Sequence, residues 1–196
     1  MNQIILKGFI RNICYSHSIN DIEFYKAQLV SKQDNGKENI INLKFKRFSN
    51  PYQENEEISL IGNIRTYSQK LDVGSRVEVY TFTYFDLPEN IEAINEAYID
   101  GRICKKGDLR KTKSGKDVID FIIANNLKTE NQSLNCYIPC VAWGKLAKEI
   151  AKKNIGDYLQ VKGQLQSREY KKKISENDFE IKVAHEVNIN ELLEEK

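Results

Sequence analysis

The sequence predicts an all-β protein made of two small closed barrels that follow one another along the chain. Segments rich in aromatic and β-branched residues recur throughout the 196 residues, and such segments are typical of strands. Two of these segments contain an interior glycine, Gly62 and Gly163, which predicts a bulge or a sharp bend at a barrel corner. Together these features indicate two tandem OB-fold five-stranded barrels, the second with a short amphipathic helix.

The first half of the chain is predicted to hold five strands and little helix. These are Ile4–Cys14, Glu23–Lys32, Glu38–Phe48, Ile58–Tyr67 and Val77–Phe85. The triplet D-N-G at 34–36 predicts a turn between the second and third strands. The third strand alternates, with Ile41, Leu43 and Phe45 on one face and Asn42, Lys44, Lys46 and Phe48 on the other. A polar loop is expected over Ser49–Glu57.

The clearest pattern lies in the second half, between Ser133 and Tyr170. A strand is predicted before Gly144, with one small apolar face of Cys136, Ile138, Cys140 and Ala142, and an opposite face of Tyr137, Pro139, Val141 and Trp143. Over Lys145–Asn154 the spacing of Leu146, Ala147, Ile150 and Ala151 predicts a helix with one apolar face, which Gly156 ends. A bent strand, Tyr158–Tyr170, follows, and a last strand begins near Val187.

The two halves also resemble each other. I-L-K-G-F-I at 5–10 parallels Y-I-D-G-R-I at 98–103, and L-I-G-N-I-R-T-Y at 60–67 parallels V-K-G-Q-L-Q-S-R at 161–168. Phe48 aligns with Trp143, and the loop that follows Phe48 takes the place of the helix. This pattern predicts a domain duplication, with an N-terminal domain over 1–88 and a C-terminal domain over 96–192.

Three motifs of the second half resemble a known family. They are D-G-R-I-C-K-K-G-D-L-R-K-T-K-S-G-K-D-V at 100–118, V-A-W-G-K-L-A-K-E-I-A at 141–151 and L-Q-V-K-G-Q-L-Q-S-R-E-Y at 159–170. In this order they are similar to the bacterial single-stranded DNA-binding (SSB) family, over Ala97 to about Leu192. The resemblance implies a protein that coats single-stranded DNA with little sequence preference, in replication, recombination or repair.

Binding of this kind needs cations along the phosphates and exposed rings that stack on bases. The resemblance places stacking rings at Tyr137, Trp143 and Tyr170, and phosphate contacts at or near Arg102, Lys145, Lys162 and Arg168. In the first barrel the analogous set is Lys44, Lys46, Phe48, Arg65 and Tyr67. Trp143 could instead pack in the core, as most tryptophans largely do. Its place opposite Ile138 and Cys140 favours exposure.

The charge of the chain is unevenly placed. The formal net charge is only +2, yet residues 97–185 hold 18 Lys and Arg against 11 Asp and Glu. The flanking segments 89–96 and 186–196 are acidic. A basic body suits a polyanion partner, although lysines can also do no more than solvate a surface. Lys171–Lys173 fits a solvated hairpin as well as it fits a DNA contact.

Cysteine usage and hydropathy predict a cytoplasmic protein without a metal or other cofactor. Cys14, Cys104, Cys136 and Cys140 form no C-x-x-C pair, so buried reduced thiols are expected. A zinc site with His17 or His185 is less favoured, because ligand spacing is lacking. No apolar run approaches the roughly 18 residues of a membrane helix, and the N-terminus lacks the features of a signal peptide, so no membrane partner is expected.

The sequence gives little support to catalysis or to a small-molecule substrate. Nucleophile, zinc-protease and phosphate-cradling motifs are absent from it, and Asp120 and Asp157 form no convincing acidic pair. A second reading is an accessory OB protein of the primosome or of replication restart, acting mainly through protein–protein interaction. The family's working unit resembles four OB barrels, so a chain with two barrels predicts a homodimer.

Overall fold

The structure is a computed structural model that describes residues 1–32, 36–47, 52–70, 75–87, 95–129, 132–173 and 178–193. Most of these residues lie in strands. The first half contains β1 (Asn2–Ile19), β2 (Ile22–Lys32), β3 (Glu38–Lys46), β4 (Glu57–Lys70) and β5 (Ser75–Asp86). The second contains β6 (Asn95–Lys106), β7 (Arg110–Lys111), β8 (Asp117–Lys128), β9 (Ser133–Trp143), helix α1 (Gly144–Lys152), β10 (Tyr158–Lys173) and β11 (Phe179–Leu193). None of the described helical residues form a segment long and apolar enough to span a membrane.

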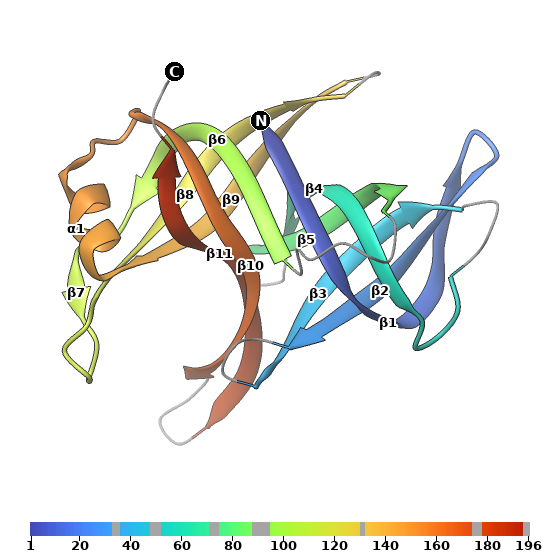
Figure 1. The fold of residues 1–196 in the computed structure, drawn as a ribbon, viewed down its shortest axis with the longest axis horizontal. Helices are drawn as coiled ribbons and strands as arrows, with labels where there is room; N and C mark the ends of the chain where they lie inside the picture. Colours follow the sequence, from blue (N-terminus) through green and yellow to red (C-terminus); the bar gives the residue numbers. More distant parts are fainter. Residues whose placement is uncertain are drawn as a thin grey trace.

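The strands close into two barrels of the same topology (Figure 1). In the first barrel β1 pairs with both β2 and β4, and the circuit runs β1-β2-β3-β5-β4. In the second barrel β6 pairs with both β8 and β10, and the circuit runs β6-β8-β9-β11-β10. Each barrel contains one parallel pair, β3 with β5 and β9 with β11. This confirms the predicted tandem OB fold.

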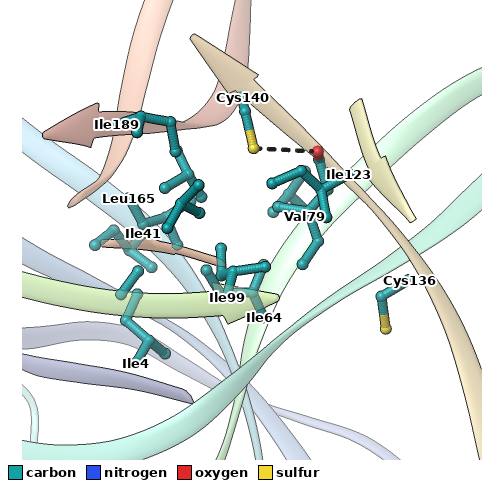
Figure 2. Packing of buried hydrophobic residues seen from close by; sticks show 14 of the residues in the cluster. Ile4, Ile41, Ile64, Val79, Ile99, Ile123, Cys136, Cys140, Leu165 and Ile189 are labelled. Atoms are coloured by element: carbon teal, nitrogen blue, oxygen red, sulfur yellow. Dashed lines mark hydrogen bonds between the residues drawn. The ribbon is translucent and has the colours of Figure 1, made fainter. Parts of the chain in front are cut away.

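The predicted core-facing sides of β3, β9 and α1 are confirmed, although Val141 on the opposite face of β9 is also buried. The buried residues include Ile41, Leu43 and Phe45 of β3, Cys136, Ile138, Cys140 and Ala142 of β9, and Ala147 and Ile150 of α1. Figure 2 shows side chains from both barrels, among them Ile4 of β1 and Ile99 of β6, within one hydrophobic cluster. Gly144 has a φ of +57°, a conformation that favours glycine, where the chain leaves β9 and enters the helix.

The interior glycines bend their strands as predicted. A register shift lies beside Gly62 in the β4–β5 ladder and beside Gly163 in the β10–β11 ladder. A Cβ atom at Gly62 would lie 2.7 Å from the carbonyl oxygen of Phe82, and one at Gly163 would lie 2.4 Å from that of Asn188. Both positions therefore need glycine, because the neighbouring backbone fills the space of a side chain.

The two barrels are related by an approximate two-fold axis. β1 and β6 lie side by side and antiparallel, and Ile4 pairs with Ala97 (Figure 1). Within its own barrel Ile4 faces Gly62, just as Ala97 faces Gly163. Ile4 and Ala97 are therefore equivalent positions that face each other, as at the centre of an isologous interface between two identical subunits.

An asparagine on each side of this axis binds the backbone of its own barrel. The Asn2 amide donates to the Ile64 carbonyl at 2.8 Å and accepts from the Ile64 N–H at 2.9 Å. The Asn95 amide does the same at Leu165, at 2.7 Å and 3.0 Å. The two barrels therefore share this pair of polar contacts at equivalent positions.

Each barrel also extends a hairpin to the other barrel. Thr66 of the β4–β5 hairpin accepts a hydrogen bond from the backbone N–H of Tyr137 at 2.8 Å. Ser167 of the β10–β11 hairpin accepts one from the backbone N–H of Ile40 at 2.9 Å. The starts of β9 and β3 are thus held by the opposite barrel.

Two element boundaries differ from the sequence-based expectation, whereas the described part of the first-barrel loop agrees with it. The last strand begins at Phe179 and not near Val187, because Phe179–Ile181 pairs with Lys171–Lys173, so this lysine run belongs to a hairpin strand. The helix spans Gly144–Lys152, which is shorter at its end than predicted. Residues 52–56 form no helix, as expected for the loop, whereas Phe48–Pro51 and most of the predicted turn at 34–36 lie outside the described residues.

The strand registers also correct the alignment of Phe48 with Trp143. Leu43 faces Thr81 across β3–β5, and Cys140 faces Val187 across β9–β11. Thr81 lies two residues before Thr83, which faces Gly62. Val187 likewise lies two residues before Ile189, which faces Gly163. Leu43 and Cys140 are therefore equivalent, and the counterpart of Trp143 is Lys46. The bulges in the strands make this two-residue offset invisible to sequence comparison.

Candidate nucleic-acid interface

Tyr137 and Trp143 lie on the outward face of the second barrel. Alternation along β9 turns both away from the core side, and they are six residues apart on one strand. The Tyr137 side chain is 49% exposed. The Trp143 ring is half-buried, and the Lys116 ammonium lies 5.4 Å from its centroid. A ring with a cation at its face is suited to a base whose phosphate the cation could contact.

Arg168 and Tyr170 follow one another along the outward face of β10. Tyr170 is 38% exposed, and the Arg168 guanidinium lies 6.0 Å from its ring centroid. The Arg168 Nε donates to the buried Glu186 carboxylate at 3.0 Å, and this hydrogen bond raises the pKa of Arg168. Glu186 therefore holds the guanidinium in place and competes with a phosphate for it.

The remaining cations predicted in the second barrel differ in their surroundings. Arg102 is exposed, and Ala124 pairs with both Arg102 and Tyr137, which places that arginine and that ring in one cross-strand row. Lys145, at the start of α1, has a side chain that is 91% exposed. Lys162 faces β6, where Tyr98 and the Glu96 carboxylate, 3.1 Å away, raise the pKa of its ammonium. Lys145 also lies 3.9 Å from the Glu149 carboxylate, so Lys162 and Lys145 both have an acidic partner, and that of Lys162 is the nearer.

In the first barrel, rings and cations form a continuous belt. We define the barrel 1 belt as Phe24, Lys44, Arg65, Tyr67, Tyr80 and Phe82. The Lys44 ammonium lies 3.9 Å from the Tyr80 centroid and 4.5 Å from that of Tyr67. The Arg65 guanidinium lies 3.9 Å from the centroid of Phe82. Lys44, Arg65 and Tyr67, predicted from the sequence, are thus brought together. Lys46 is exposed beside Phe24, and Phe48 lies outside the described residues.

Burial changes the electrostatics of the belt. Desolvation lowers the pKa of Lys44, and the neighbouring Lys26 lowers it further, while Glu78 raises it. Desolvation also lowers the pKa of Arg65. A nearby anion favours the charged form of such cations, so a phosphate on this face would offset part of the cost of their burial.

Sequence reasoning missed three rings of the belt: Phe24, Tyr80 and Phe82. In a half-buried strand the aromatic side chains usually face the core and the threonines face outward. The run Y-T-F-T at 80–83 of β5 is reversed, because Thr81 and Thr83 are buried while Tyr80 and Phe82 point outward. Strict alternation from the buried Val79 would have identified these rings.

The cysteines are all free, but their burial differs from the prediction. Cys136 and Cys140 are buried, and burial raises the pKa of both thiols. Cys14 and Cys104 are exposed, because the strands that carry them extend past the barrel core. Among the residues that the structure describes, no group of His, Cys, Asp and Glu is arranged to hold a metal ion.

Comparison with known proteins relates this chain to proteins that carry OB barrels. Residues 94–192 match the single-strand binding protein family. Over 81 residues the chain is 38% identical to a single-stranded DNA-binding protein of Enterococcus faecalis, a stretch that covers 39% of this chain and 43% of that protein. The chain thus spans less than half the length of this curated relative.

Two solved structures share the fold along the whole chain. The wild-type single-stranded DNA binding protein from Thermus aquaticus superposes with a TM-score of 0.75 at 17% identity, covering 100% of this chain and 93% of that one. A deletion mutant of the same protein gives 0.72 at 18% identity, with 100% and 96% covered. The family match runs from β6 through β11 and takes in half of the chain. The chain belongs to the single-strand binding protein family.

Proposed function

We propose that this protein binds single-stranded DNA with little sequence preference and coats it during replication, recombination or repair. The observation that carries the proposal is the outward face of β9, where Tyr137 and Trp143 present rings beside cations. Stacking on a ring is tolerant of sequence, because every base has a π-face. Paired bases in a duplex are stacked on one another already, so this face favours a single strand.

Each of the two predicted domains, 1–88 and 96–192, supplies one binding face under this proposal. The binding face of the first domain is the barrel 1 belt. The binding face of the second consists of Tyr137, Trp143, Tyr170, Arg102, Lys145 and Arg168. The protein acts by binding, in the cytoplasm, without catalysis, cofactor, metal or small-molecule substrate. Membership in the single-strand binding protein family supports this reading.

Salt should weaken binding steeply if lysine and arginine contact the phosphates. In a titration of oligo-dT followed by Trp143 fluorescence, the logarithm of the binding constant should fall with the logarithm of salt concentration. The expected slope is roughly −0.7 for each phosphate neutralised. A binding constant that does not change with salt would contradict the proposed phosphate contacts.

We also propose that two chains assemble into a homodimer with four OB barrels. The β1–β6 pairing already joins two barrels about an approximate two-fold axis, so a dimer of chains would double this unit. Light scattering at micromolar concentration should give twice the chain mass of 22.8 kDa. A mass equal to that of one chain would refute the dimer and leave DNA binding to be judged by the titration.

A further inference from the structure

The outward faces of β2–β3 and β8–β9 are equivalent by register, yet they differ in chemistry. In the first barrel the central cross-strand pairs are Lys26 with Lys44 and Gln28 with Asn42. The corresponding pairs of the second barrel are Asp120 with Val141 and Ile122 with Pro139. The first barrel therefore has amines and amides at positions where the second has mainly apolar side chains, of which Val141 is buried. Amides and amines form hydrogen bonds in defined directions, whereas stacking rings do not.

A pocket opens on this polar face of the first barrel. It has a volume of about 220 Å³ and is lined by Asn12, Lys26, Ala27, Gln28, Asn42, Leu43, Lys44 and Glu78. This volume is below the roughly 300–1,000 Å³ of sites for drug-sized ligands, which suits a single base better than a whole nucleotide. The belt residues Tyr67 and Tyr80 lie against Lys44 at its rim.

The pocket wall on the β1–β2 side is held in place by a hydrogen bond. Asn12 has a φ of +57°, an uncommon conformation for a residue other than glycine, at an irregularity of the β1–β2 ladder. Its side-chain amide nitrogen donates to the side-chain oxygen Oε1 of Gln28 at 2.7 Å. The side chains of Lys26 and Asn42 make no hydrogen bond within the described residues, so their donors are available to a ligand.

Donors and an acceptor lie on opposite sides of the pocket. β3 lies between β2 and β5 in the barrel, so Lys26 of β2 and Glu78 of β5 line opposite sides. Glu78 accepts a hydrogen bond from the Tyr67 hydroxyl through one carboxylate oxygen, which fixes the carboxylate at the rim. A base that fits must offer acceptors along one edge and donors along another.

Guanine is the base that meets this requirement. Its O6 and N7 are adjacent acceptors suited to lysine and amide donors, and its N2 amino group is a donor suited to a carboxylate. Adenine places its N6 donor beside N7, which would face the lysine. Cytosine has its donor and its acceptors on one edge, so it cannot address two opposite walls.

We propose that the pocket of Lys26, Asn42, Lys44 and Glu78 in the first barrel holds one guanine base of a bound single strand. This site rests on the proposed binding of single-stranded DNA and adds a base preference to it. The guanine lies within a strand because the cations Lys46 and Arg65 continue outward from the pocket region along the same face, where neighbouring phosphates would run.

The test compares short thymidine oligonucleotides that contain a single central guanine, adenine or cytosine, by fluorescence anisotropy. The guanine oligonucleotide should bind about tenfold more tightly than the other three, including all-thymidine. Glu78→Gln should abolish this preference while binding all-thymidine no less tightly, since the glutamine keeps an acceptor for Tyr67 and removes a negative charge. Asn42→Ala should reduce the preference in the same direction.

Glu57→Gln is the matched control, because Glu57 is an exposed carboxylate of β4 in the same barrel and lies outside the pocket; it should keep the preference. Equal affinities for all bases, a preference for cytosine, or a preference that survives Glu78→Gln would overturn the guanine site while all-thymidine binding sustains the proposed function. Deoxyguanosine monophosphate that binds as tightly as the guanine oligonucleotide would also overturn it, by assigning the pocket to free nucleotides. If all-thymidine fails to bind at all, both proposals fall.

Discussion

Replacing Trp143 with alanine should weaken binding of single-stranded DNA by about 1–3 kcal/mol, the range for one base–aromatic stack. That is a loss of roughly 5- to 150-fold in affinity, which anisotropy of a labelled oligo-dT can resolve. Trp143→Phe should recover most of the loss, because phenylalanine keeps a π-face. In the parent protein Trp143 is the only tryptophan, so single-stranded DNA should quench its emission strongly and duplex DNA far less.

Phe9→Ala provides a matched control for this experiment. Phe9 is 46% exposed on β1, outside the proposed interface, so its loss should leave the affinity unchanged. A Trp143→Ala variant that melts early but binds normally while folded would assign the ring to packing against Val118 and the start of the helix. Unchanged binding in variants of both Trp143 and Tyr170 would favour a protein that acts through partner proteins.

Replacing Asn2 with alanine should lower the stability of the fold by roughly 2–5 kcal/mol. The change removes both hydrogen bonds to Ile64, whose backbone is fully buried, and each buried polar group left unpaired costs about 1–3 kcal/mol. For a protein of this length the melting temperature should fall by about 5–15 °C. Differential scanning calorimetry measures the effect.

Two further variants serve as a weaker case and a control for the Asn2→Ala experiment. Asn95→Ala should cost less than Asn2→Ala, because the Leu165 carbonyl keeps a second donor, the Asn39 amide at 2.8 Å. Asn190→Ala, at an exposed position of β11, should leave the melting temperature almost unchanged. Equal stability of the Asn2→Ala variant and the parent would show that the two hydrogen bonds from Asn2 to the Ile64 backbone do not stabilise the fold.

The parts of the fold that could be predicted are those in which local pattern and burial agree. Cys136, Ile138, Cys140 and Ala142 alternate along β9, and all four are buried, because a strand places every second side chain on the core. The helical spacing around Ile150 is equally local. In these segments each residue's own chemistry matches its place in the barrel.

The length of β11 could not be predicted in the same way. Phe179, Ile181 and Val183 are largely exposed beyond the barrel, so no buried face is present in the sequence around them. Their strand forms by pairing with the end of β10, where Phe179 faces Lys173 and Val183 faces Glu169. His185 then contacts the Ile40 carbonyl of the opposite barrel at 2.9 Å, a contact between distant parts of the chain.

The candidate site also contains residues that could be predicted from the sequence and residues that could not. Tyr137 and Trp143 were predictable, because one strand places both on its outward face. The pocket of the first barrel was not, since Asn12, Asn42 and Glu78 come from three strands and meet only through the closed topology. Polar residues scattered along β-strands are ordinary, and their convergence depends on strand register, which bulges shift.

Pairing two barrels about an axis within one polypeptide has a genetic consequence. In a dimer of identical subunits, every point mutation appears twice, once on each side of the axis, so both interfaces change together. Here each mutation is inherited by one side alone. Asn2 and Asn95 could therefore remain the same residue in both barrels. Lys44 and its counterpart Val141 could mutate independently and become different residues.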